Sequence, residues 1–365
     1  MADSIVLGIM VCKTANLFYE KEFYKFLQKF GKEKNLFVYV FYPDYINWKT
    51  KKVQGFQFNF NSNTWFSDRF PTPDFVYDRC FYTSSKIYLK YKTYVEQIKQ
   101  NKKIRFLGYG LKGKMEVYRI LSTNPQLVKY LPETERLTNT QQFINWLNKS
   151  PVILKPTGGS HGAGVIKVSK EKSKYLAVGR DVKNNKIMIP FDNLANLTTW
   201  LSNIFKEKKY LIQEYLDLNT SNNKPFDIRV VIQKNNLGDW ETIGMVARLG
   251  DTGNITSNLH GGGTVQEVTS LLNQEFGEEN AEQIKNEITF LANTIPPYLE
   301  SSHGELFEIG LDLGVDRKGR VWIIEVNSKP GRKVFSLLND REKRIKSLVQ
   351  PIYYTEYLSK LNRRK

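Results

Sequence analysis

Two carboxylates and one amide are spaced so that a β-hairpin would bring them together. Two strand-like runs flank the turn-forming residues 316–319 (Asp-Arg-Lys-Gly), which predicts a hairpin. Glu325 and Asn327 are two residues apart and therefore point to one face of the second strand, while Asp312 stands at a similar distance from the turn on the first. Because three oxygen donors with room for water suit Mg²⁺, the hairpin predicts a metal site. A solvated sheet face is the structural alternative.

A glycine-rich segment at residues 156–164 lies between two further strand-like runs, 152–155 and 165–168. Glycine lets backbone N–H groups approach a phosphate closely, so this loop predicts a phosphate cradle. The Lys-Ser/Thr pair of a Walker A loop is missing, which disfavours a P-loop NTPase. The loop also fits the G-x-S-x-G pattern with Ser160 as nucleophile, but that pattern needs a helix after the turn. We expect Ser160 to contact phosphate or simply to fit a turn.

A second glycine pattern, G-x-G-x-x-G at residues 108–113, matches the dinucleotide fingerprint. It does not follow the first strand of the chain. Its acidic partner would be Glu133, in a proline-containing loop. A nicotinamide site is therefore disfavoured.

The elements that must position these residues can be read from apolar periodicity. The first hundred residues alternate strand-like runs with helical or loop segments such as residues 17–30, which indicates a small α/β unit. Residues 48–73 are rich in Asn, Gln and aromatic residues without clear periodicity, and we expect irregular structure there. Further strands are expected at 152–155, 165–168, 210–214, 228–233, 242–249, 305–314 and 320–327, and helices at 114–121, 140–147 and 281–291.

The composition fits a compact protein. The chain has 365 residues, of which 41% are hydrophobic, enough to bury a sizeable core. No apolar run approaches the roughly 20 residues that cross a bilayer. The acidic start and the missing cleavage pattern argue against a signal peptide, so we expect a cytoplasmic protein. Cys12 and Cys80 are too few for a disulfide scaffold or a cysteine zinc site, and we expect both in the core.

Basic residues outnumber acidic ones by 54 to 37, which gives a net charge of +17. Such a surplus attracts polyanions, but no zinc-finger, RNP or KH pattern accompanies it, so nucleic acid is disfavoured as a partner. Part of the surplus lies at residues 332–333, beside the predicted metal hairpin, and part at residues 341–346. We expect these cations to attract an acidic peptide or protein, with solubility as the alternative.

The order of these motifs resembles that of ATP-grasp ligases, and within them the YheC/YheD endospore coat-associated group. The resemblance is carried by the glycine loop, the hairpin with Pro-Gly at 330–331, Leu-Pro-Glu-Thr at 131–134 and Ser-Asn-Leu-His-Gly-Gly at 257–262. It implies an α/β (α+β) fold in which two α+β lobes close over ATP. The implied division is an amino-terminal α/β domain at 1–110, a lid lobe at 111–215, a metal-binding lobe at 216–350 and a basic tail at 351–365.

The resemblance also implies roles for individual residues. The implied ATP contacts are Lys114, Lys155, Gly158, Gly159, Ser160, Gly162, Gln213, Glu214, Tyr215, Leu216, Asp227 and Arg229. Arg248 and Lys155 would be catalytic cations beside the transferring phosphoryl group, and Asp312, Glu325 and Asn327 would hold Mg²⁺ or Mn²⁺. Asn258, His260 and Gly262 would contact the acceptor or a phosphate group, with a structural role for His260 as the alternative.

The chemistry that the resemblance implies is the ligation of a carboxylate to an amine through an acyl phosphate. In phosphoryl transfer, positioned cations and metal ions do most of the catalytic work, and each implied position holds a chemically competent residue. The sequence carries no motif for the two substrates. Two alternatives stay open: a non-catalytic ATP-binding scaffold that contacts spore coat proteins, and a basic nucleic-acid-binding protein.

Overall fold

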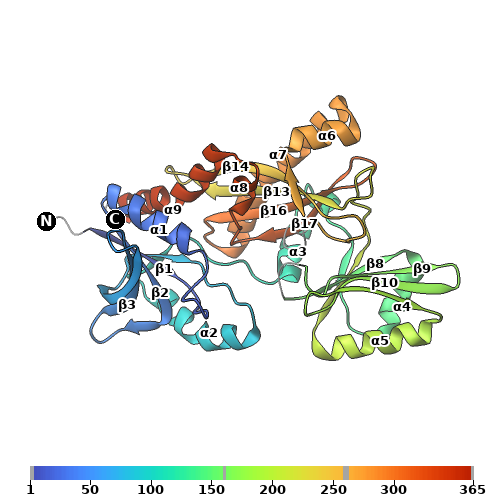
Figure 1. Cartoon of the computed structure of the whole chain (residues 1–365), viewed down its shortest axis with the longest axis horizontal. Helices are drawn as coiled ribbons and strands as arrows, with labels where there is room; N and C mark the ends of the chain where they lie inside the picture. The colour runs from blue at the N-terminus through green and yellow to red at the C-terminus, as the bar shows by residue number, and fades with distance from the viewer. Residues whose placement is uncertain (1–3, 159–161, 258–262, 363–365) are drawn as a thin grey trace.

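The computed structural model describes residues 4–158, 162–257 and 263–362, and its strands form three sheets (Figure 1). The fold mixes helices with parallel and antiparallel strands, which confirms the predicted α+β class. In the described residues, no helix combines the length and apolarity needed to cross a bilayer.

The amino-terminal sheet is parallel in its centre and continues into an antiparallel hairpin. Cys12 and Cys80 follow two of its strands, and both are buried as expected. Helix α1 (Lys21–Glu33) packs against β2, and α2 (Ser85–Gln100) follows β5. In spatial order the strands are β4 (Thr64–Pro71), β3 (Lys52–Asn59), β2 (Leu36–Asn47), β1 (Ile5–Met10), β5 (Phe75–Asp78) and β6 (Arg105–Phe106).

The expectation of irregular structure at residues 48–73 was wrong, because β3 and β4 form a regular hairpin there. In β3, Gly55 and Phe56 are both buried although they are neighbours, which interrupts the alternation that marks a strand. In β4 only Phe70 is buried, because this strand lies at the edge of the sheet. Neither strand therefore shows the regular alternation of apolar and polar residues from which a strand is predicted.

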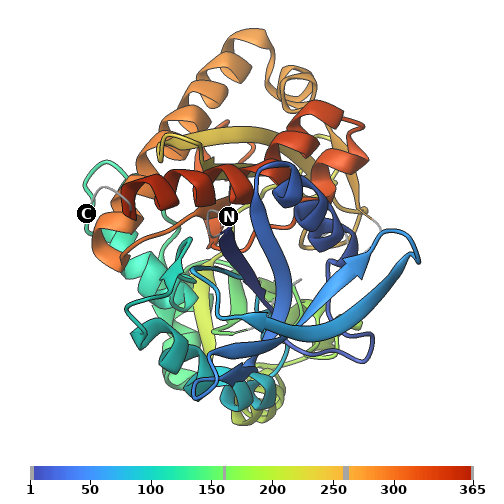
Figure 2. The ribbon, with the colours of Figure 1, turned by 90° about the vertical axis from the view of Figure 1, so that its left-hand side faces the viewer.

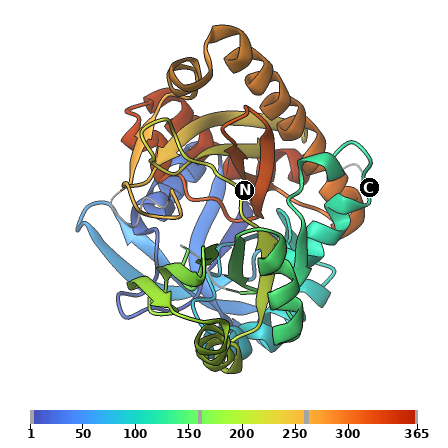
Figure 3. The ribbon, with the colours of Figure 1, turned by 90° about the vertical axis from the view of Figure 1, so that its right-hand side faces the viewer.

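The second sheet is antiparallel throughout and is called here the lid sheet. Helices α4 (Thr140–Lys149) and α5 (Leu194–Glu207) cover one face, where the apolar core of this unit lies (Figure 3). The hairpin predicted around the glycine loop is confirmed by the pairing of β8 with β9. In spatial order the strands are β11 (Lys186–Phe191), β10 (Lys174–Arg180), β9 (Ile166–Glu171), β8 (Val152–Pro156), β12 (Tyr210–Glu214) and β7 (Thr134–Arg136).

The third sheet carries most of the predicted site. Alternate residues of its central strand, Phe226 to Ile232, face a core formed with α3 (Lys114–Ser122), α6 (Val268–Phe276) and α7 (Glu278–His303). The short helix η1 (Val128–Tyr130) packs beside β17. In spatial order the strands are β15 (Thr264–Gln266), β14 (Trp240–Leu249), β13 (Phe226–Lys234), β16 (Glu308–Val315) and β17 (Val321–Asn327).

The carboxyl-terminal helices tie the third sheet to the amino-terminal sheet. After α8 (Lys333–Leu337), the long helix α9 (Arg341–Asn362) runs beside α1 (Figure 2). Ile352, Tyr354 and Leu358 are buried in the amino-terminal core. Residues 351–362, expected to belong to a basic tail, are thus part of a packed helix, because their apolar side chains complete that core.

Candidate functional site

A row of charged side chains crosses the face of the third sheet opposite to its core. Arg248 on β14 is paired in register with Asp227 on β13, and Arg229 on β13 is paired with Asp312 on β16. Asp312 is in turn opposite Glu325 on β17. Because residues directly opposite one another share a face of the sheet, all five side chains lie on one side. The hairpin register predicted from the sequence is confirmed.

Two arginines hold the carboxylates of this row. The Nε and Nη2 atoms of Arg248 each donate to Asp227 at 2.6 Å, and Nη2 also lies 3.1 Å from Asp312 Oδ1. Arg229 contacts both oxygens of Asp312, with Nη2 2.9 Å from Oδ2. Burial alone would raise the pKa of Asp312, but the two guanidinium groups outweigh it and hold that pKa below its ordinary value.

The hairpin residues fit a hard metal ion. Within residues 4–158, 162–257 and 263–362, no three His, Cys, Asp or Glu side chains cluster as a metal site. Two carboxylates and the Asn327 amide do, however, supply the oxygen donors that Mg²⁺ prefers. Among the described residues, Asp312 Oδ2 accepts one hydrogen bond and Glu325 forms one ion pair, through Oε1, so lone pairs of both carboxylates are available for a cation. The assignment of these three residues as ligands remains a proposal.

The lid sheet supplies a second group of polar side chains. Lys155, on β8, places Nζ 2.5 Å from Oε1 of Gln213 on β12, and Gln213 donates to Thr134 Oγ1 at 2.7 Å. Lys114, the first residue of α3, lies 3.3 Å from Glu325 Oε1 and so reaches the third sheet. Burial, and then the nearby charge of Lys114, lowers the pKa of Lys155 to about 8.

The predicted hinge and glycine loop lie beside Lys155. Glu214 ends β12, and its carboxylate accepts from the backbone N–H of Glu133 at 2.8 Å. The ring of Tyr215 is covered by Lys167, whose Nζ lies 3.8 Å from the ring centroid. Gly158 has open space where a Cβ would be, and Gly162 has φ 74°, a backbone conformation that favours glycine. Leu216 follows directly in the hinge.

Several predicted contacts lie outside the described residues. They are Gly159, Ser160, Asn258, His260 and Gly262.

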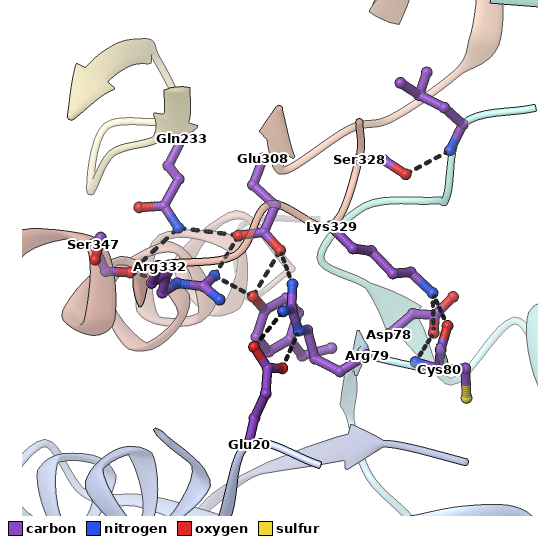
Figure 4. Close-up of polar contacts among 12 residues, drawn as sticks. Glu20, Asp78, Arg79, Cys80, Gln233, Glu308, Ser328, Lys329, Arg332 and Ser347 are labelled. Atoms are coloured by element: carbon purple, nitrogen blue, oxygen red, sulfur yellow. Dashed lines mark hydrogen bonds and ion pairs between the residues drawn. The ribbon is translucent and has the colours of Figure 1, made fainter. Parts of the chain in front are cut away.

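A buried polar network, the junction network, joins the amino-terminal sheet to the third sheet (Figure 4). Arg79, just after β5, donates to Glu20 at 2.7 and 2.9 Å and to Glu308 on β16 at 2.7 Å. Tyr77 donates to Glu308 at 2.8 Å and accepts from Arg332 at 2.6 Å. Each charge therefore has a partner of opposite sign, which is the condition for burying charges without a large penalty.

The turn that follows Asn327 is fixed by the same end of the amino-terminal sheet. Lys329 Nζ donates to Asp78 Oδ1 at 2.8 Å and to the carbonyl of Cys80 at 2.9 Å (Figure 4). Ser328 Oγ accepts from the backbone N–H of Leu111 at 2.9 Å. Because this turn comes directly after Glu325 and Asn327, the amino-terminal unit positions the proposed metal ligands.

One sequence expectation about the basic residues was wrong. Arg332 was expected to attract an acidic partner, but it is 7% exposed and bonds to Glu308, Tyr77 and the carbonyl of Ser347. Its charge is used inside the protein. Further on, Lys343 pairs with Asp340 and Lys346 with Glu241, so these cations are partly neutralised.

Sequence reasoning missed the junction network and the link between Lys329 and Asp78. Glu308 could have been identified from the sequence, because strand alternation places it on the same face of β16 as Asp312. Arg79 had none, since a fully buried arginine looks like any surface arginine in a sequence.

Comparison with known proteins agrees with this architecture. Residues 103–358 match the family model described as YheC/D like ATP-grasp. The chain is 32% identical over 307 residues to the endospore coat-associated protein YheC of Bacillus subtilis, covering 83% of each chain. It is 26% identical over 326 residues to YheD of the same organism, covering 88% of this chain and 71% of YheD.

Solved structures support the fold. D-alanyl-alanine synthetase A from Vibrio cholerae superposes with a TM-score of 0.53 at 14% identity, covering 98% of this chain and 99% of that one. The D-alanine-D-alanine ligase from Coxiella burnetii gives a TM-score of 0.50 at 10% identity, covering 98% of both chains.

Proposed function

The chain belongs to the YheC/D-like ATP-grasp family, and from that membership and the site geometry we propose that it is an ATP- and Mg²⁺-dependent ligase joining a carboxylate to an amine. The observation that carries the proposal is the position of Lys114. Lys114 connects α3 to Glu325, which belongs to the row of charged side chains on the third sheet. Its charge also lowers the pKa of Lys155 on the lid sheet. Two cations that could bind phosphates thus lie beside a carboxylate that could hold a metal, which supports the proposal.

The proposed reaction has two steps. A substrate carboxylate attacks the γ-phosphate of ATP, which forms an acyl phosphate and releases ADP. An amine then attacks the acyl carbon, and phosphate leaves as the amide forms. Lys155 and Lys114 would bind the phosphates, and the Gln213–Leu216 segment would hold the adenine. A metal ion held by Asp312, Glu325 and Asn327 would neutralise charge on the phosphoryl oxygens.

The arginines have a different place in this scheme. Arg248 is bound to Asp227 through two hydrogen bonds and touches Asp312, so in this structure its charge is shared between carboxylates. We propose that Arg248 supplies positive charge beside the transferring phosphoryl group, and that its two hydrogen bonds to Asp227 hold the guanidinium in place. Arg229 would keep Asp312 oriented toward β17.

Two measurements test the proposed function. Thermal unfolding should shift upward with Mg-ATP, because a ligand that binds only the folded state stabilises it. ADP release should then be screened over amino acids, peptides and acidic proteins, with mass analysis of any product. Wild-type protein that is indifferent to Mg-ATP would overturn the proposal.

A second candidate function is a non-catalytic ATP-binding component of the spore coat. The names of the two Bacillus subtilis relatives favour a coat association, which we also propose for this chain. A scaffold predicts Mg-ATP binding without ADP formation for any substrate pair. An active ligase predicts ADP release that depends on both substrates.

A further inference from the structure

A pocket of about 210 Å³ lies between the lid sheet and the segment that follows β14. One wall is made by the ends of β10 and β11, including Val178, Arg180 and Met188. The other wall is residues 253–256. The pocket is separate from the Lys155–Gln213 pair, because β9 lies between β8 and β10 in the lid sheet.

The pocket adjoins the phosphate end of the proposed site. Gly162, from the glycine loop, is part of its lining. Thr256 lines the other wall, and the next residue, Ser257, donates a hydrogen bond to Asp227 in the charged row. A group held in this pocket would therefore lie next to the place where the γ-phosphate is expected, if the proposed function is correct.

The pocket carries positive charge that no carboxylate of the described residues neutralises. Arg180 and Lys186 are paired in register across β10 and β11. No ion pair joins either of them to a carboxylate within the described ranges. The nearest carboxylate in sequence, Asp181, accepts instead from the backbone N–H groups of Lys183 and Asn185 and from the Asn185 side chain. Arg180 Nη1 donates to the backbone carbonyl of Asn184 at 2.9 Å, which orients the guanidinium but does not neutralise its charge. Both cations can therefore attract an anionic ligand.

Apolar surface lies beside the two cations. Met188 is 69% exposed, and methionine adapts its shape to varied apolar partners. Ile255, from the opposite wall, lies so close to Gly179 that a Cβ added there would be 3.1 Å from its Cδ1 atom. The two walls of the pocket therefore approach each other closely at this point.

The size of the pocket limits what it can hold. Sites for whole small-molecule ligands usually measure about 300–1,000 Å³, which is larger than this pocket. Its volume suits one or two side chains of a longer chain. β11 is also the outermost strand of the lid sheet, so the rest of an extended chain has room beyond it.

We propose that this pocket holds an acidic, partly apolar segment of a polypeptide substrate. One carboxylate would pair with Arg180 and Lys186, and a neighbouring apolar side chain would pack on Met188 and Ile255. The inference rests on the proposed ligase function and names its substrate class. In this proposal Arg180 and Lys186 attract the acidic partner. Arg332 cannot do so, because it is buried.

The test measures binding of a fluorescein-labelled peptide of alternating glutamate and leucine residues by fluorescence anisotropy, using the full chain. The double variant Arg180→Glu/Lys186→Glu should bind the peptide about tenfold or more weakly, because attraction becomes repulsion. Lys170→Glu/Lys208→Glu is the matched control, since it changes net charge equally at exposed lid positions and should weaken binding by about twofold at most. Met188→Ala should weaken binding by about threefold.

The single variant Lys186→Glu provides a second measurement, because its exposed side chain can be changed without affecting the fold; we expect about threefold weaker binding. The Mg-ATP thermal shift should stay the same in all these variants. Failure of the peptide to bind wild-type protein, or equal weakening by both double variants, would overturn the inference. A missing Mg-ATP shift in the wild type would instead count against the proposed function, because the anisotropy comparison does not depend on ATP.

Discussion

Arg79 and Glu308 form a 2.7 Å ion pair across 229 residues of sequence, and their side chains are 0% and 3% exposed. Glu308 lies on the same face of β16 as Asp312, roughly 13 Å away along the strand. The pair thus connects the amino-terminal unit to the strand that carries a proposed metal ligand. The amino-terminal unit and the third sheet are therefore held together next to the proposed metal site.

Loss of the Arg79 charge should strongly destabilise the protein. The variant Arg79→Met leaves the carboxylates of Glu20 and Glu308 buried without their cation, and breaking a buried ion pair in this way costs about 3–5 kcal/mol. Urea unfolding followed by circular dichroism measures the change. Lys174→Met is the control, because its partner Asp192 is exposed and its loss should have little effect. Similar unfolding midpoints for both variants would contradict the role given to the network.

Two glycines of the G-x-G-x-x-G pattern should respond differently to alanine. A Cβ at Gly108 would lie 2.3 Å from the backbone nitrogen of Phe307, whereas a Cβ at Gly113 meets nothing within 4 Å. Gly108→Ala should therefore cost about 1–3 kcal/mol of stability, and Gly113→Ala should be nearly neutral. Urea midpoints test the difference. A larger loss of stability for Gly113→Ala than for Gly108→Ala would contradict the close packing assigned to Gly108.

Affinity for Mg-ATP should fall as the pH rises through 8. The lowered pKa of Lys155, about 8, means that its ammonium group loses the proton in this range. Only the protonated form attracts phosphate, so above that pH part of the binding energy must be used to restore the proton. The dissociation constant should increase by up to about tenfold per pH unit.

Calorimetric titration between about pH 7 and pH 9 measures this dissociation constant. The variant Lys155→Arg should remove the pH dependence, because arginine stays charged. A wild-type constant that does not change with pH would contradict phosphate binding by a Lys155 whose pKa is lowered into this range.

Nucleic-acid binding, suggested by the net charge of +17, makes a separate prediction. If this charge binds phosphate backbones, affinity for DNA should fall steeply with salt. We expect only weak DNA binding, because part of the positive charge is internally paired, as at Arg79 and Arg332. Filter binding at two salt concentrations distinguishes the cases. Tight binding with a steep salt dependence would favour the nucleic-acid alternative.

The sequence predicted those parts of the site that lie within one local motif. The pairing of Asp312 with Glu325 could be predicted because both residues belong to one hairpin, where strand alternation and a turn define the register. The β8–β9 hairpin around the glycine loop was predictable for the same reason. In both cases the informative residues are close in sequence.

Contacts between distant segments could not be predicted in this way. Nothing in the sequence places Asp78 beside Lys329 or Arg79 beside Glu308, because such pairs depend on how whole units pack. The pairing of Arg180 with Lys186 was missed for another reason: both lie in a segment without any motif, and only the strand register brings them together. The same holds for the basic end, where the burial of Arg332 reversed its expected role.

Calorimetric titration with Mg-ATP tests the central claim most directly. The wild-type chain should bind Mg-ATP, and chelation of the metal should weaken binding. Glu325→Gln should weaken it by about tenfold or more, because a carboxylate that holds the metal becomes neutral. Glu279→Gln, which removes an exposed carboxylate of α7, should bind like the wild type. Wild-type protein that does not bind Mg-ATP, or Glu325→Gln that binds it as tightly as Glu279→Gln, would contradict the claim that the two lobes form a metal-dependent ATP site.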